Sequence, residues 1–160
     1  SHADLVLAPY RMMVPRRDGG YDTREYSLLP AGEYSKVDYL WQLTGNAAAF
    51  YYGVLWNKLY RGSLIREGQL RCDEELAWSE DFLFNLQYAR LCRRFCALHT
   101  PVYYYCKNER SITATRIHPW NAVKVKTEIF NYYKEFYDSL GLYDENKGKV
   151  YRYLVSLAEC

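Results

Sequence analysis

The stretch that decides the fold is WSEDFLFNLQYARLC, residues 78–92. Ser79 suits the N-cap position of a helix, and Glu80 and Asp81 then fall in the first turn, where acidic side chains favour the positive end of the helix dipole. Apolar or small side chains recur at helical spacing at Phe82, Leu86, Ala89 and Cys96, and Arg90, Arg93 and Arg94 occupy the other side. The sequence therefore predicts an amphipathic helix that begins at Ser79.

Strand patterns and a further helix follow this stretch. Phe95–Leu98 and Val102–Cys106 read as strands separated by Pro101, and residues 107–118 read as a polar loop. Pro119 suits the first turn of the next helix. One face of that helix carries Ile129, Tyr133, Phe136 and Leu140 before a stop at Gly141, and Val150, Leu154 and Leu157 begin another helix that continues to Cys160. The apolar stripe on these two helices is ordinary core or a surface for membrane-bound neighbours.

The part before residue 78 mixes strand and helix signals. Residues 4–14 read as one buried strand that starts close to the first residue, and residues 15–22 read as a loop. Further on, the patterns predict a helix over Lys36–Leu43, an apolar strand-like run over Phe50–Tyr60, one or two helical turns over Ser63–Glu67 and an extended piece over Leu70–Leu76.

Length and composition indicate one folded domain of the α/β or α+β class. The 160 residues are 49% hydrophobic and 25% charged, close to the globular average. Strand and helix patterns alternate, without an internal repeat or a linker. With 21 basic and 19 acidic residues the net charge is only +2, so a nucleic-acid partner is not expected.

The chain has no pattern of a membrane span or a disulfide framework. No apolar run approaches the roughly 20 residues that a spanning helix needs, and the start lacks the features of a signal peptide. The five cysteines are odd in number and form no C-x-x-C pair, which favours a reducing compartment. We therefore expect the chain in the cytoplasm, with the inner face of the membrane as the place where a parent enzyme would act.

Tyrosine and tryptophan are abundant, with 18 and 4 residues. Their flat rings with a polar edge suit stacking on sugars or bases, and they suit half-buried packing equally well. Tyr103, Tyr104 and Tyr105 alternate as a strand should, so one face of that strand can look toward a site and the other into the core.

Four short motifs in order resemble the second half of bacterial family 2 glycosyltransferases. They are residues 56–60 (WNKLY), residues 78–85 (WSEDFLFN), residues 102–105 (VYYY) and residues 110–113 (RSIT). Each motif is weak by itself, but their order and spacing over about 60 residues are hard to imitate. The resemblance implies a GT-A type fold for nucleotide-diphospho-sugar transfer.

In that family the first half of the fold carries the donor site and a D-x-D metal motif. Residues 4–6 look like the strand that follows this motif, and no D-x-D occurs in the chain. The resemblance thus implies a partial GT-A core over residues 1–118 and a helical tail over residues 119–160, within one acceptor-side domain. It also implies that the parent enzyme uses Mg or Mn through an upstream D-x-D, while this chain holds no cofactor and is inactive alone.

The resemblance assigns Asp81 as the catalytic base and Glu80 as its assistant. Sugar transfer needs a group that takes the proton of the acceptor hydroxyl, and a shielded carboxylate can do so. The competing interpretation is that both acids only stabilise the helix dipole. The position of the pair between the other motifs favours catalysis.

Acceptor binding is implied for Trp56, Asn57, Lys58 and Tyr105. An indole or phenol ring can stack on a sugar, and the amide and ammonium can bond hydroxyl or phosphate oxygens. For Trp56, packing at a strand end is an equal alternative. For Tyr105, packing into the core is the default.

The polar loop contributes the expected diphosphate contacts. Arg110, Ser111 and Arg116 would reach the donor, because guanidinium groups pair with phosphate oxygens in a bidentate manner. The alternative is a solvated basic loop that includes Thr113. His118 stands alone beside Pro119 and is assigned no metal.

These inferences predict an inverting glycosyltransferase of bacterial surface polysaccharide synthesis, which uses a nucleotide-sugar donor and a glycan or lipid-linked acceptor. The alternative is a non-catalytic carbohydrate-binding or protein-interaction domain, for which the tyrosine content is the main support. Single-strand nucleic-acid binding would need a basic groove, which the net charge disfavours. We also expect self-association or domain swapping through apolar surface that the upstream half would cover.

Overall fold

The structure is a computed structural model that describes residues 2–46, 49–74, 79–106 and 119–155. Strands and helices alternate along these residues, as the sequence predicted. In chain order the elements are β1 (Leu5–Leu7), β2 (Tyr10–Pro15), β3 (Tyr21–Tyr26), β4 (Gly32–Ser35), α1 (Lys36–Gly45), α2 (Phe50–Gly53), β5 (Lys58–Tyr60), α3 (Gly62–Glu67), α4 (Glu80–Leu91), β6 (Arg94–Ala97), β7 (Tyr103–Cys106), α6 (Pro119–Asp138) and α7 (Tyr143–Val155).

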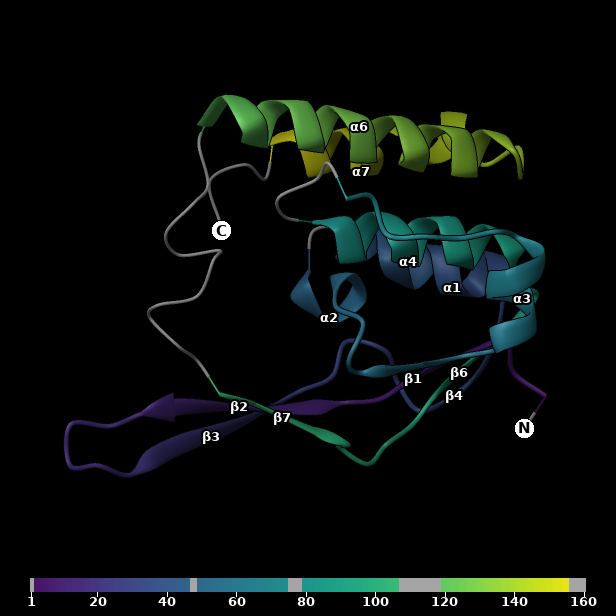
Figure 1. Ribbon diagram of the computed structural model, residues 1–160. Coiled ribbons are helices and arrows are strands. Elements are labelled where there is room, and N and C mark those ends of the chain that lie inside the picture. Colours follow the sequence, from purple (N-terminus) through teal and green to yellow (C-terminus); the bar gives the residue numbers. More distant parts are fainter. Residues whose placement is uncertain (1, 47–48, 75–78, 107–118, 156–160) are drawn as a thin grey trace.

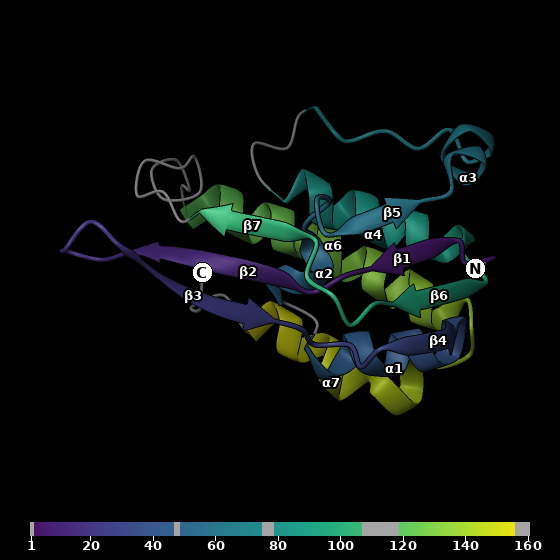
Figure 2. The ribbon, with the colours of Figure 1, turned by 90° about the horizontal axis from the view of Figure 1, so that it is seen from below.

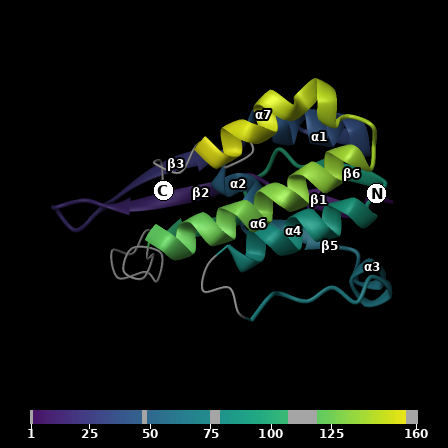
Figure 3. The ribbon, with the colours of Figure 1, turned by 90° about the horizontal axis from the view of Figure 1, so that it is seen from above.

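The described elements form three layers (Figure 1). Two small sheets make the lowest layer, and α1, α2 and α4 lie on one face of them. The long helices α6 and α7 lie on α4 and α1 and pack against each other, as Figure 3 shows from above. The core therefore fills the space between the sheets and the first helical layer and continues up to α6.

The strands form a four-stranded sheet of order β4-β6-β1-β5 and a three-stranded sheet of order β3-β2-β7 (Figure 2). In the first sheet β1 runs parallel to β6 and antiparallel to β5. In the second sheet β2 runs parallel to β7 and antiparallel to β3. The same two chain segments, β1–β2 and β6–β7, thus lie side by side through both sheets.

A break at Pro9 corrects the prediction of one strand over residues 4–14. β1 ends at Leu7, and β2 begins at Tyr10 in the other sheet. Proline lacks the N–H that a ladder needs, so it interrupts pairing. The Pro9 carbonyl still accepts from the main-chain N–H of Val102 at 3.2 Å, which keeps the two segments together across the break.

The region from residue 50 to residue 60 also differs from its prediction as one strand-like run. Phe50–Gly53 is a short helix, and only Lys58–Tyr60 forms a strand. The preference of aromatic residues for strands depends on what packs around them. Here Tyr51 and Tyr52 are buried in the core on a short helix instead. Residues 70–74 form no strand in the structure, although an extended piece was predicted there.

Alternate side chains of the first sheet face the helices. Leu5, Leu7 and Phe95 are fully buried, whereas Val6 and Cys96 on the opposite face are only partly buried. Tyr39 of α1 stacks on Phe95, with 4.0 Å between ring centroids. Much of the tyrosine content serves this packing, since seven of the tyrosines that the structure describes are buried: Tyr10, Tyr39, Tyr51, Tyr52, Tyr88, Tyr133 and Tyr137.

The two long helices agree with the sequence pattern. α6 begins at Pro119, and Ile129, Tyr133 and Phe136 are almost completely buried on its inner face. Gly141 has a φ of 67°, the left-handed conformation that glycine adopts readily after a helix. Within the described part of the chain, no helix combines the length and apolar character that crossing a membrane requires.

Candidate active site

Asp81 lies in the first turn of α4. The helix starts at Glu80, and Ser79 before it has a left-handed backbone with a φ of 64°. The Ser79 side chain forms no capping bond, so the predicted N-cap role is wrong in its chemistry although the helix starts where it was expected. Oδ1 of Asp81 instead accepts from the main-chain N–H of Phe82 at 2.7 Å. The carboxylate therefore occupies the positive end of the helix.

The surroundings of Asp81 favour a protonatable carboxylate. Burial raises the pKa of Asp81, and the like charge of Glu80 raises it further. The N–H of Phe82 and the ammonium of Lys58 act in the opposite direction on this pKa, and the net result is a raised value. A raised pKa brings the carboxylate closer to the range in which a general base works best.

Asn57 and Lys58 are buried at the start of β5. Asn57 is 0% exposed, and its Nδ2 donates to the carbonyls of Ala8 at 3.3 Å and Tyr51 at 3.1 Å. Lys58 is 8% exposed, and its Nζ donates to Oδ1 of Asn57 at 2.8 Å. The polar side chains of both residues thus find their hydrogen-bond partners within the chain itself. These bonds link α2 to the edge of the first sheet.

Asn85 connects α2 to α4 and had no role in the sequence analysis. Its Nδ2 donates to the carbonyls of Gly53 and Val54 and, at 2.9 Å, to that of Asp81. Its Oδ1 accepts from the hydroxyl of Tyr60 at 2.7 Å. The signal that could have revealed it is an amide within an apolar helical stretch, since buried amides are retained where they bond main-chain groups.

An aromatic cluster lies beside the same short helix. Trp56 stacks on Tyr103 and Tyr105, with 4.3 Å and 5.6 Å between ring centroids. Phe50, at the start of α2, meets the edge of Tyr105 at 5.2 Å. Phe50 and Tyr103 are among the large exposed apolar side chains. The cluster therefore offers flat aromatic surface to solvent on the sheet side of α2.

The aromatic cluster and α4 both contact α2. Phe50 at its start belongs to the cluster, and the carbonyl of Gly53 at its end bonds Asn85 of α4. Figure 1 shows α2 between the start of α4 and the sheets. The structure thus places Trp56 and Tyr105 together in the cluster, Glu80 and Asp81 together in the first turn of α4, and Asn57 and Lys58 together in the core.

No family model matches the chain, and no curated protein sequence matches it. Among solved structures, the chain is similar to the crystal structure of residues 1–349 of S. aureus TarS in complex with UDP-GlcNAc, with a TM-score of 0.56 and 19% sequence identity. The similarity covers 98% of this chain and 49% of the TarS chain, so the chain spans about half the length of that structure. The chain has a glycosyltransferase-like fold.

This likeness confirms the predicted α/β class and the partial glycosyltransferase fold. At 19% identity it concerns the fold alone, so the assignment to family 2 stays a prediction. The residues expected to contact the diphosphate, Arg110, Ser111 and Arg116, lie outside the described residues, as do Thr113 and His118.

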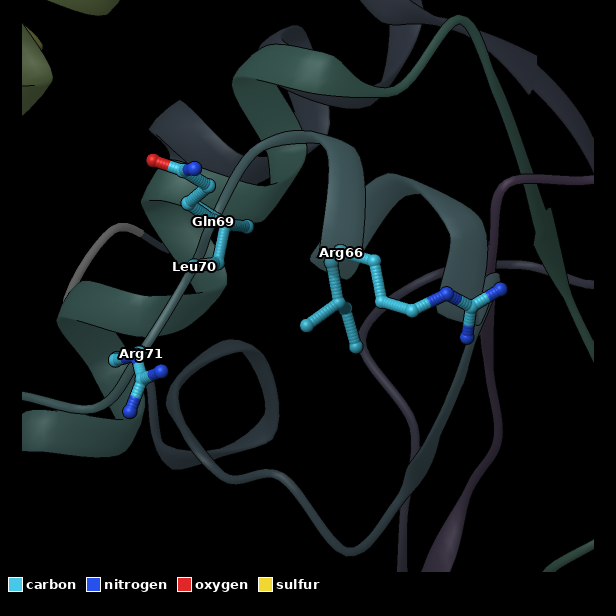
Figure 4. A pocket seen from close by; sticks show the side chains of 5 residues that line it. Arg66, Gln69, Leu70 and Arg71 are labelled. Carbon is cyan, nitrogen blue, oxygen red and sulfur yellow. The ribbon is translucent and has the colours of Figure 1, made fainter.

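This glycosyltransferase-like fold also has a hollow beside α3. It has a volume of about 600 Å³ and is lined by Ile65, Arg66, Gln69, Leu70 and Arg71 (Figure 4). Gly68 packs against Leu91 at the last turn of α4. A helix rises about 1.5 Å a residue, so roughly 15 Å separates that turn from Asp81. One side of the hollow thus lies near the far end of α4, whereas Arg71 on its other side precedes Cys72, which interacts electrostatically with Asp81.

Proposed function

We propose that the chain is the acceptor-side half of a glycosyltransferase that transfers a sugar from a nucleotide-diphospho-sugar, with Asp81 as its base. The observation that carries this proposal is the half-buried carboxylate of Asp81 at the first turn of α4, with a raised pKa, in a glycosyltransferase-like fold. The similar TarS structure is a complex with UDP-GlcNAc, which supports a nucleotide-sugar donor.

In the proposed reaction Asp81 takes the proton of an acceptor hydroxyl as its oxygen bonds to the anomeric carbon. The bond from that carbon to the diphosphate breaks in the same step, and the nucleotide diphosphate leaves with the electron pair. A single displacement inverts the anomeric centre. The negative charge of the preceding residue, Glu80, raises the pKa of Asp81. It therefore increases the affinity of the Asp81 carboxylate for the proton.

The aromatic cluster is the proposed acceptor surface. Trp56 and Tyr105 present stacked rings, and a sugar ring can lie on such a surface through its C–H face. The polar atoms of Asn57 and Lys58 already bond this chain's own oxygens. We therefore propose that these two residues hold the floor of the site, and that contact with the acceptor falls to the rings.

The donor contacts and the metal belong to residues that the described part does not show. Arg110, Ser111 and Arg116 stay the proposed partners of the diphosphate. The described residues bring together no group of three or more His, Cys, Asp or Glu side chains, so they do not fit a metal ion. The Mg or Mn of the parent enzyme stays assigned to an upstream D-x-D, and no step above depends on it.

For the parent enzyme we propose a role in bacterial surface polysaccharide synthesis, with a glycan or lipid-linked acceptor at the inner face of the membrane. A carbohydrate-binding domain without catalysis is the second candidate, and the solvent-facing rings of Phe50 and Tyr103 favour it. The two candidates share the aromatic surface, and they differ in the need for the carboxylate of Asp81.

The experiment is sugar transfer and donor hydrolysis by an enzyme that includes the residues upstream of this chain, with UDP-GlcNAc as the first donor. Asp81→Asn should lower kcat by about 10²- to 10⁴-fold, the usual contribution of a general base. Glu67→Gln, an exposed acid of α3, is the matched control and should keep full activity. Unchanged turnover in Asp81→Asn would remove the proposed base.

Tyr105→Ala separates the two candidates further. In the enzyme it should raise the KM for the acceptor and leave donor hydrolysis unchanged, because the ring binds acceptor only. If the wild-type protein binds glycans but turns over no nucleotide-sugar with the upstream residues present, the binding-domain candidate replaces the enzyme.

A further inference from the structure

Lys58 is an unusual core residue, because lysine is almost never fully buried unless it is paired. Its Nζ donates to the carbonyls of Tyr51 at 3.0 Å and Val54 at 2.5 Å, as well as to Oδ1 of Asn57. Three oxygens satisfy all three N–H groups of an ammonium. None of these oxygens carries a full charge, so the charge of Lys58 is still without an ionic partner among its hydrogen-bond acceptors.

We propose that Lys58 is a positioning residue for Asp81: its ammonium, fixed on three oxygens between α2 and β5, holds the carboxylate of the candidate base in its charged form. The inference rests on the proposed function for its catalytic meaning. The coupling between the two side chains is a property of the folded chain and can be tested without any substrate.

A short chain of hydrogen bonds fixes the two residues relative to each other. The Val54 carbonyl accepts from Lys58 Nζ at 2.5 Å and from Asn85 Nδ2 at 3.4 Å. The same Nδ2 donates to the Asp81 carbonyl at 2.9 Å. One carbonyl and one amide therefore join the ammonium to the main chain of the first turn of α4.

The electrostatics are reciprocal. Burial lowers the pKa of Lys58 to about 7, and the charge of Asp81 opposes this lowering. Burial raises the pKa of Asp81, and Lys58 acts against this rise. Glu80, Tyr60 and Cys72 also interact with Asp81, and these three are anions or neutral groups. Among these described groups Lys58 supplies the positive charge.

The proposal differs from a purely structural role in what a substitution does to the neighbouring carboxylate. If Lys58 only ties α2 to β5, its removal changes stability and leaves the proton affinity of Asp81 alone. If its charge acts on Asp81, removal raises the pKa of the carboxylate, since a nearby opposite charge lowers such a pKa.

The test is an NMR pH titration of the Asp81 carboxyl group in the whole chain, in wild type and in Lys58→Met. We expect the midpoint to move upward by about 1 pH unit or more. Lys36→Met is the matched control, because Lys36 donates to the Arg90 carbonyl at the other end of α4 and interacts with a different set of charges. An unchanged midpoint in Lys58→Met overturns the proposal.

A reciprocal titration covers the case in which Lys58→Met does not fold. Asp81→Asn removes the charge in the first turn of α4 and keeps the shape of the side chain. The midpoint of the Lys58 titration should then fall, because the carboxylate that raises the pKa of Lys58 has gone. A Lys58 midpoint that stays constant also overturns the proposal.

In the complete enzyme the acid limb of the kcat/KM profile should shift to higher pH in Lys58→Met and stay in place in Lys36→Met. The two hypotheses fail separately. Full activity of Asp81→Asn with intact coupling removes the proposed function only, whereas absent coupling with an inactive Asp81→Asn removes only the role of Lys58.

Discussion

Asn85 donates a hydrogen bond from Nδ2 to the main-chain oxygen of Asp81, one helical turn earlier in α4, at 2.9 Å. The same amide bonds the Gly53 carbonyl at the end of α2. A single buried side chain therefore fixes the turn that carries the candidate base against the helix that carries the edge of the aromatic cluster.

Asn85→Leu should destabilise the chain. The leucine fills a similar volume but leaves the Gly53 carbonyl and the Tyr60 hydroxyl without a partner, and each buried unsatisfied group costs about 1–3 kcal/mol. Urea unfolding measures the difference. Gln87→Leu is the control on the same helix, because Gln87 is less buried and makes one bond of 3.2 Å to Tyr132. Equal losses in the two variants contradict this account of Asn85.

Gly53→Ala should destabilise the chain, because the new methyl group would disturb the contact between α2 and α4. A Cβ at Gly53 would stand 2.7 Å from Cδ2 of Phe82, closer than real side chains approach, so the cost should be about 1–3 kcal/mol. Gly148→Ala in α7 has open space around the new carbon and should stabilise by up to about 1 kcal/mol. Thermal unfolding of both variants tests the pair, and a stabilised Gly53→Ala would show that the contact yields.

Lys58 should make stability depend on pH. The unfolded chain has an ordinary lysine pKa of about 10.4, so between about pH 7 and 10 it binds more protons than the folded chain at this residue. Stability should therefore rise with pH in this window, by up to about 1.4 kcal/mol per pH unit, and stay level below it. Lys58→Met should lose this rise, whereas exposed Lys147→Met should keep it. Urea unfolding at several pH values measures the free energy of unfolding. Parallel plots of this free energy against pH for wild type and Lys58→Met would contradict the lowered pKa of Lys58.

Leu59→Glu should reduce self-association. Leu59 is 69% exposed on the sheet face opposite the helices, and it pairs in register with Val6, which pairs in turn with Cys96. This apolar row favours contact with a second copy of the chain. Light scattering should give a mass above the monomer in wild type and a lower mass in the variant. Leu28→Glu, outside the sheets, is the control. A monomeric wild type would remove the expectation.

Local signals explain which parts of the fold were predictable. Helix boundaries are set by signals that act within one helical turn of their own position. Examples are the acidic pair after Ser79, the proline at residue 119 and the glycine at residue 141, and the helices begin or end at these places. The strand predicted over Phe95–Leu98 corresponds to β6, whereas the helical spacing drawn on to Cys96 is wrong, since α4 ends at Leu91 and Cys96 pairs with β1 and β4. Strand pairing depends on partners far away in sequence, so spacing alone could not reveal it.

The sequence by itself determined the class of the fold and the start of α4, because periodicity and the acidic first turn are written in neighbouring residues. Only the tertiary structure decided that Pro9 divides one segment between two sheets, that Asn57 and Lys58 bond the chain's own carbonyls, and that Asn85 joins α2 to Asp81. The physical reason is burial: whether a polar group binds a ligand or satisfies the core depends on what packs against it, and those partners come from distant parts of the chain.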